Sequence, residues 1–228
     1  MGRLARGTPQ TPCMTEIVLM GDPRVAGIPV VESGEPLVDV ATAGVLVDRR
    51  YATPAGHWRL VRASVRDRLA VAAAALPDGV RLLLVEGHRL PSQQLASFTG
   101  YRDQRAAADP GLSDADLDRL ASRYIAPPGV APHTAGAAVD VTLCTDAGVE
   151  LHLGTRVNAT PEESRLRCYT AAPDLDDGAR ADRDLLCRVL AGAGLVNYPT
   201  EWWHWSYGDR YWAMQTGAPA AVHGPVER

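Results

Sequence analysis

Apolar residues recur along the chain at characteristic spacings that predict a series of helices and short strands. Residues 56–79 carry apolar side chains at near-helical spacing and end in Pro-Asp-Gly, which predicts a helix. The short continuous apolar run at 80–87 is typical of a buried strand. Residues 91–108 begin with proline at the first helical position and residues 113–128 begin with a serine cap, so both segments predict helices.

A strict alternation in residues 137–144 predicts a strand with two different faces. In this pattern Asp140 and Thr142 lie on one face, whereas Val139 and Val141 lie on the other. We therefore expect a strand that packs its apolar face and offers a carboxylate on the opposite one.

The remaining pattern defines the fold class. Residues 177–194 predict a helix that ends at Gly194, and residues 195–198 and 202–207 predict a pair of strands. Helices and short strands alternate without the regular rhythm of a parallel sheet. The sequence thus predicts an α+β fold, a single domain with a small antiparallel sheet flanked by helices. The loop at 146–176 carries the weakest pattern.

The chain length indicates one domain with loose ends. A chain of 228 residues is enough for one hydrophobic core of normal size. We expect residues 1–14 to form a loose leader, residues 15–215 the single folded domain, and residues 216–228 a tail rich in small residues, proline and glycine. His223, in this tail, is expected to be solvated.

Composition and charge exclude several classes of protein. The 46% of apolar and 22% of charged residues are ordinary for a globular protein. All 23 basic residues are arginine, and against 27 acidic residues they leave a net charge of -4, which argues against a nucleic-acid or membrane-surface partner. The chain has no secretory apolar segment and no run near the ~18 apolar residues of a membrane span, so we expect a cytoplasmic protein. Its four cysteines are widely spaced and are expected to be reduced.

Two short motifs carry residues that are able to bind a metal ion. "HTAGAAVD" contains His133 and Asp140, and "EWWH" contains Glu201 and His204. Either motif alone is common by chance, and tryptophan at alternating positions usually means core packing. Together, two imidazoles and one carboxylate match the three-ligand arrangement that catalytic Zn²⁺ uses, whereas structural zinc prefers four ligands. We therefore expect one Zn²⁺ per chain.

The strand predicted at 202–207 is expected to use its two faces differently. His204 shares a face with Trp202, so one face binds metal and substrate while the other packs into the core. A third patch, "EGHRL", places His88 and Arg89 after the strand at 80–87, where they are candidates for the pocket. His57 and His152 are expected to lie away from the site.

The order of these motifs resembles the VanX-like D-alanyl-D-alanine dipeptidase family of zinc peptidases, which also holds D,D-carboxypeptidases. The family pattern is S-x-H-x-x-G-x-A-x-D followed by E-x-W-H, with an upstream G-Y-R. Here these motifs stand as "APHTAGAAVD", "EWWH" and "GHR", over roughly residues 80–210. The double tryptophan in "EWWH" resembles the dipeptidase branch more than the carboxypeptidase branch.

The resemblance implies a role for each motif residue. His133, Asp140 and His204 would be the zinc ligands, Glu201 the catalytic base, and Arg89 a group that assists the transition state. The implied activity is zinc-dependent hydrolysis of a small D-amino-acid dipeptide, D-Ala-D-Ala first of all. The implied partner is a small peptide, and the oligomeric state is left open.

Three positions depart from the family pattern at places expected to contact substrate. His88 replaces the tyrosine of G-Y-R, Ala131 replaces the serine before the first ligand, and Asn158 stands where an acidic residue would hold the free ammonium of the substrate. Loss of that charge would weaken recognition of an unblocked dipeptide. Three acidic residues of the same loop are candidates to replace it: Asp146, Glu162 and Glu163.

Two other functions stay open on the sequence. One is a D,D-carboxypeptidase, or a peptidase that acts on another D-peptide, with or without a blocked N-terminus. The other is a non-catalytic zinc-binding module on the same scaffold, as in the related Hedgehog signalling domain. The presence of Glu201 and Arg89 argues against the module, because a purely structural metal site needs neither residue.

Overall fold

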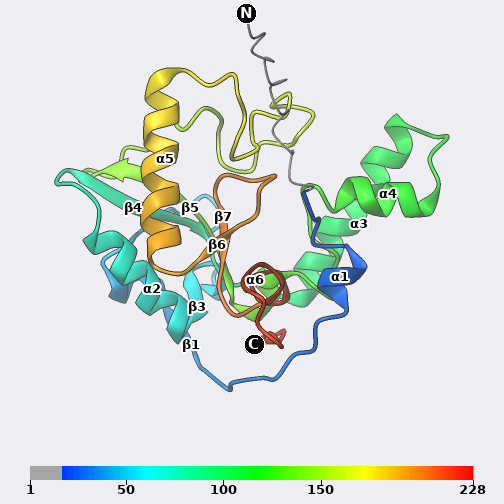
Figure 1. Ribbon diagram of the computed structural model, residues 1–228, viewed down its shortest axis with the longest axis horizontal. Helices are drawn as coiled ribbons and strands as arrows, with labels where there is room; N and C mark the ends of the chain where they lie inside the picture. Colours follow the sequence, from blue (N-terminus) through cyan, green and yellow to red (C-terminus); the bar gives the residue numbers. More distant parts are fainter. Residues whose placement is uncertain (1–16, 228) are drawn as a thin grey trace, which may run out of the picture.

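A five-stranded mixed sheet forms the centre of the protein in the computed structural model, which describes residues 17–227 (Figure 1). The strand order is β2-β4-β5-β7-β6, with β2 parallel to β4 and every other neighbour antiparallel. The strands are β2 (Leu46–Val47), β4 (Val80–Glu86), β5 (Ala138–Thr145), β6 (Val196–Asn197) and β7 (His204–Ser206). The two longest strands, β4 and β5, are therefore neighbours at the centre.

Helices and a second small sheet surround this centre. The small sheet pairs β1 (Leu37–Asp39) with β3 (Leu60–Arg62) in antiparallel register. The α-helices are α1 (Pro23–Ala26), α2 (Ala63–Ala74), α3 (Pro91–Ala108), α4 (Asp114–Ala121), α5 (Asp177–Gly192) and α6 (Arg210–Thr216). Three 3₁₀ turns complete the described chain: η1 (Val40–Ala43), η2 (His57–Arg59) and η3 (Pro132–Ala135).

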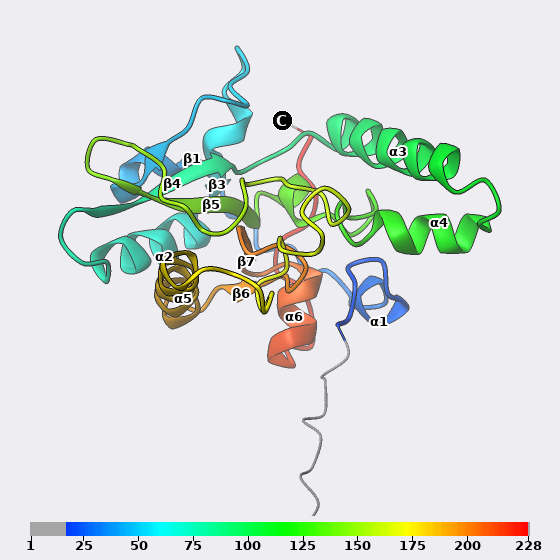
Figure 2. The same ribbon diagram turned by 90° about the horizontal axis from the view of Figure 1, so that it is seen from above.

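The main core lies between the sheet and helices α2 and α5, which are in contact with each other on one side of it (Figure 2). Leu69 of α2 and Leu186 of α5 join Val139 and Val141 of β5 in one buried cluster. The predicted inward face of the 137–144 strand is therefore confirmed. Helices α3 and α4 pack on each other and extend beyond the end of the sheet as an arm (Figure 2).

The fold class is confirmed, with corrections to two predicted elements. The helix predicted at 56–79 is wrong over its first third, because residues 57–62 form η2 and β3 and only Ala63–Ala74 is helical. The strand predicted at 202–207 shortens to His204–Ser206. Both errors have one cause: apolar residues that meet distant partners fit more than one local pattern.

The segment predicted to be a loose C-terminal tail is folded against the domain. Ala221 pairs with Val30 in a parallel bridge, and His223 is 2% exposed. The prediction of a solvated His223 is therefore wrong. The leader predicted at 1–14 lies outside the described residues. Within residues 17–227, no helix is both long enough and apolar enough to cross a membrane.

Arg183 of α5 ties the long loop before this helix to the core. Its side chain is fully buried, and its guanidinium donates to the carbonyl oxygens of Leu153, Arg167 and Tyr169. Burial lowers the pKa of Arg183 to about 10, which leaves it protonated at neutral pH. The guanidinium of Arg183 therefore supplies hydrogen bonds to several carbonyls of the loop that are not paired in a strand.

We expect Arg183→Ala to lower the free energy of unfolding by about 3–5 kcal/mol, because it leaves several buried carbonyls without this donor at a cost of about 1–3 kcal/mol each. Denaturant unfolding followed by circular dichroism measures this change. Arg188→Ala, at an exposed position of the same helix, is the matched control and should change stability by less than about 0.5 kcal/mol. Equal losses in the two variants would contradict the role assigned to Arg183.

Candidate metal centre and active site

A row of three ionisable side chains crosses the middle of the sheet. Glu86 in β4 pairs with Asp140 in β5, and Asp140 pairs in turn with His204 in β7. Residues that face each other on neighbouring strands project to the same side of a sheet. Strand pairing alone therefore brings the three side chains together, and all three are buried.

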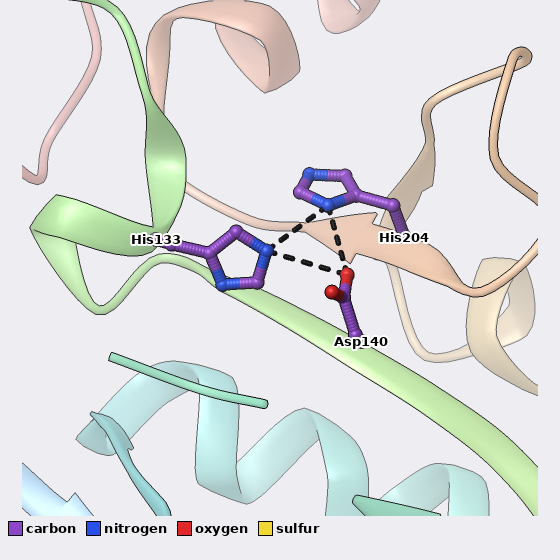
Figure 3. Close-up of side chains that lie close together, drawn as sticks. All are labelled: His133, Asp140 and His204. Carbon is purple, nitrogen blue, oxygen red and sulfur yellow. Dashed lines mark hydrogen bonds and ion pairs between the residues drawn. The ribbon is translucent and has the colours of Figure 1, made fainter. Parts of the chain in front are cut away.

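Three donor atoms from this region form a nearly equilateral triangle (Figure 3). His133 Nε2 lies 3.2 Å from His204 Nδ1 and 3.3 Å from Asp140 Oδ1, and the last two atoms are 3.1 Å apart. Ligands at ordinary zinc bond lengths in a tetrahedral site stand about 3.3 Å from one another. His133, Asp140 and His204 thus have the spacing of three ligands to one metal ion.

The turn η3, which carries His133, is held in place by glycine and by backbone contacts. Gly136 ends this turn with a φ of 64°, and a Cβ there would lie 2.3 Å from a methyl carbon of Leu37. His133 Nδ1 donates to the Gly87 carbonyl at 2.7 Å. A carbonyl only accepts, so Nε2 keeps its lone pair for a metal, an arrangement common among metal-binding histidines.

The ionisation of the three side chains in the triangle favours a bound cation. Burial alone would raise the pKa of Asp140, but His133 and His204 outweigh burial and hold this pKa well below its usual range. Burial opposes protonation of His133, yet the Asp140 carboxylate outweighs it and raises the pKa of His133. Burial lowers the pKa of His204. One metal ion would satisfy the carboxylate and both imidazole lone pairs at once.

Glu201 lies just before β7, beside the triangle and outside it. Its Oε2 is 3.8 Å from His204 Nδ1, and its Oε1 is buried with no hydrogen-bond partner within residues 17–227. Burial and the neighbouring Asp140 carboxylate raise the pKa of Glu201 well above its ordinary value, and Arg89 opposes them. A carboxyl group with a raised pKa is suited to take up a proton and return it.

Arg89 reaches the same region from the end of β4. Its Nε donates to Glu86 Oε1 at 2.7 Å, its Nη2 donates to Glu86 Oε2, and its Nη1 donates to Gln94 Oε1 at 2.9 Å. Burial disfavours the charged guanidinium, but Glu86 outweighs burial and raises the pKa of Arg89. Three of its five N–H groups are used in these bonds, which leaves two for an oxygen of a ligand.

A cavity of about 490 Å³ lies against these residues. The three donors, Glu201 and Arg89 all line it, and so do three of the predicted substrate residues: His88, Ala131 and Asn158. Asn158 donates through Nδ2 to the Tyr51 hydroxyl at 3.0 Å, so two loops meet at the wall of the cavity. The structure therefore brings together eight of the nine predicted site residues.

Trp202 is the exception. Its ring is fully buried in the main core, its Nε1 donates to Thr155 Oγ1 at 2.8 Å, and it does not line the cavity. The prediction that Trp202 shares a face with His204 and contacts substrate is wrong, because β7 begins only at His204 and the two tryptophans before it lie in a turn.

Several lining residues escaped the sequence analysis. Glu86 and Gln94 hold Arg89, and Tyr51 and Tyr124 lie near Asn158, whose carbonyl accepts from the Tyr124 hydroxyl at 3.0 Å. Glu86 is the first residue of the motif "EGHRL" and stands three residues before Arg89, so the sequence did offer a signal that the two side chains pair. Tyr51 comes from a loop without a pattern, and Tyr124 lies in the turn after α4, within the segment 113–128 that was predicted to be helical throughout.

The other histidines and acidic residues divide between the cavity and the surface. His57, expected away from the site, lines the cavity with its ring 5.7 Å from that of His88. His152 is exposed, as expected. The three acidic candidates to replace the missing charge at Asn158 do not line the cavity: Asp146, Glu162 and Glu163.

A buried set of two imidazoles and one carboxylate, open to a cavity and flanked by a carboxyl group and an arginine, defines a metal-dependent hydrolase. Comparison with known proteins gives the family. Residues 38–218 match the model of the Peptidase_M15 family, described as D-Ala-D-Ala dipeptidase. The chain belongs to this family, and it is a metallopeptidase. The family is zinc-dependent, and the donor set found here fits Zn²⁺.

Two curated relatives are named D-alanyl-D-alanine dipeptidase. The protein from Synechocystis sp. is 27% identical over 221 residues, which cover 82% of this chain and 88% of the relative. The protein from Escherichia coli (strain K12) is 30% identical over 116 residues, 51% of this chain and 56% of the relative.

Two solved structures match more weakly. The LD-carboxypeptidase LdcB matches with a TM-score of 0.46 and 17% identity, over 82% of this chain and 75% of that one. VanYB in complex with D-alanine-D-alanine matches with a TM-score of 0.36 and 19% identity, over 77% of this chain and 93% of that one.

Proposed function

We propose that this protein hydrolyses the peptide bond of D-Ala-D-Ala, with Zn²⁺ on His133, Asp140 and His204 and with Glu201 as the general base. The triangle of donor atoms beside Glu201 and an open cavity is the observation that carries the proposal. Both curated relatives are named for this dipeptide, which supports the choice of substrate.

The residues of the chain divide the chemistry among them. When bound, Zn²⁺ supplies a Lewis acid that makes water more acidic. Glu201 takes a proton from the attacking water and gives it to the leaving amine, which its raised pKa favours. Arg89 directs its free N–H groups at the oxygen on which negative charge develops. Its bidentate bond to Glu86 fixes the guanidinium plane before substrate arrives.

A direct assay tests the proposal. The purified chain with one equivalent of zinc is incubated with D-Ala-D-Ala, and free D-alanine is measured over time. We expect release that stops on addition of a chelator and returns with added Zn²⁺, because the ligands stay in place while the metal leaves. Absence of release at any zinc concentration, with the L,L-dipeptide equally inert, would refute the proposed function.

We expect Arg89→Ala to lower kcat by about 10²–10³-fold, the usual loss on removal of one transition-state donor. This change also leaves Glu86 buried without its partner, so the double variant Glu86→Gln/Arg89→Ala is the matched control. If Arg89 acts on the substrate, the double variant stays as slow as the single one. A double variant with near-normal kcat would show that Arg89 serves only to neutralise Glu86.

A second candidate substrate is a peptide whose amino end is blocked, as in a D,D-carboxypeptidase. Three carboxylates line the cavity within residues 17–227: Glu86, Asp140 and Glu201. The first is paired with Arg89, and the other two belong to the metal site. A free ammonium would therefore find no unengaged carboxylate near Asn158. Comparison of kcat/KM for D-Ala-D-Ala and its N-acetyl form decides between the two substrates.

A further inference from the structure

The chain segment Ala221–Val226, here named the C-terminal strap, packs against the wall of the active site from outside the cavity. Its first half lies against Gly208, two residues beyond β7: the Gly208 carbonyl accepts from the backbone N–H groups of Val222 and His223 at 2.7 and 3.0 Å. The strap then runs toward η3, the turn that carries His133. It lies outside the region 38–218 that the family model matches, so family membership assigns it no role.

Val226 joins the strap to the site through both of its backbone groups. Its N–H donates to the Thr134 carbonyl at 2.8 Å, one residue after His133. Its carbonyl accepts from His88 Nε2 at 3.1 Å. His88 is 1% exposed and lines the cavity next to Arg89. A single residue of the strap thus contacts both a cavity side chain and the metal-binding turn.

Arg62 anchors the strap on its other side. This arginine is 4% exposed, and its Nη2 donates to the Gly224 carbonyl at 3.0 Å while its Nε donates to the Ala135 carbonyl at 2.7 Å. Glu32 completes the anchor by accepting from the Gly224 N–H at 2.6 Å and from Arg62. The strap is therefore clamped by buried charge-assisted bonds, which are stronger than neutral ones.

We propose that the C-terminal strap is a positioning element of the active site, in which Val226 fixes the ring of His88 and the turn that carries His133. A backbone carbonyl accepts only, so its bond to His88 places the proton on Nε2 and leaves Nδ1 as an acceptor. Loss of Val226 would free the His88 ring to rotate and to change tautomer. The effect on catalysis rests on the proposed function, whereas the effect on the ring does not.

A double-mutant cycle tests the catalytic half. We compare the full chain and a chain that ends at Pro225, each with His88 and with His88→Ala, in the zinc-loaded form. The shortened chain should lose about tenfold in kcat/KM when His88 is present and only about threefold when it is absent, because the loss through the His88 ring is then gone and only the loss through the Thr134 bond remains. Glu227→Ala, at an exposed position just beyond the strap, should leave kcat/KM unchanged. Equal losses in both backgrounds would overturn the proposal.

A spectroscopic readout tests the positioning half independently of activity. Imidazole ¹⁵N shifts, assigned by comparison with His88→Ala, should show His88 as the Nε2–H tautomer in the full chain and as a mixture in the shortened one. Unchanged shifts in the shortened chain would overturn the proposal. If that chain fails to fold, Glu32→Ala, which removes the acceptor that holds the Gly224 N–H and so loosens the strap, replaces it in both measurements. An inactive full chain would refute the proposed function and leave this readout valid.

Discussion

Glu201→Ala should lower kcat for D-Ala-D-Ala by about 10²–10⁴-fold while one zinc per chain remains bound. General acid-base catalysis by a positioned side chain contributes that range. The metal should stay because the donor atoms belong to three other residues, and Glu201 Oε2 lies 3.8 Å from the nearest of them. Steady-state kinetics and metal analysis of the same preparation measure both quantities.

The controls for this variant separate loss of the carboxylate from loss of packing. Glu201→Gln keeps the size of the side chain and should be as slow as the alanine variant, because an amide cannot take up the proton. Glu163→Ala removes an exposed carboxylate that pairs with Arg156 and should leave kcat unchanged. A Glu201→Ala protein with near-normal kcat would remove Glu201 from the mechanism.

His204→Ala should abolish both zinc binding and activity. Even changes to residues behind a ligand commonly cost 10–100-fold in metal affinity, so loss of a ligand should cost more than about 10²-fold. At equal protein and zinc concentrations we expect less than one tenth of the zinc content of the unmodified chain after dialysis. Hydrolysis should fall to the level of the chelated enzyme.

His152→Ala is the matched control for the ligand variant. It also removes an imidazole, but from an exposed position where the ring faces Asp176 at 3.6 Å. Zinc content and kcat should both match those of the unmodified chain. Full zinc occupancy in His204→Ala would mean that the ion sits elsewhere, and the triangle would then lose its assigned role.

Local sequence was sufficient to predict some elements accurately. Helix α3 begins at Pro91 and ends at Ala108, as predicted, because proline fixes the first turn without losing a needed N–H. Ser113 caps α4 by accepting from the Asp116 N–H at 3.2 Å. Each of these features depends on residues within one turn of the chain, so the chain alone reveals them.

Long-range contacts explain the elements that the sequence did not reveal. The burial of His223 depends on contacts with Ser33 and Ser64, which lie more than 150 residues away. The strand β3 pairs with β1, and its apolar residues also fit the helical spacing predicted for 56–79. A short segment whose structure comes from such partners carries little local pattern of its own.

The residues of the candidate site likewise fall into two groups, those that local motifs predict and those that only long-range pairing brings in. His133, Asp140 and His204 were predicted from two motifs because their residue types match one metal and their spacing matches a known family. Glu86 was not predicted, because its place beside Asp140 follows from the register of β4 and β5, which includes a shift between Leu84 and Glu86. A register of this kind is fixed by packing across the sheet and not by neighbours in sequence.

The row of paired residues across the central strands separates reactivity from selectivity. Glu86, Asp140 and His204 sit on the rigid middle of the protein, whereas Tyr51 and Asn158 come from connecting loops. Loops tolerate insertion and exchange far better than paired strands do. Grafting new loops around an unchanged sheet should thus retune which peptides are cut without altering how they are cut, which makes this scaffold modular.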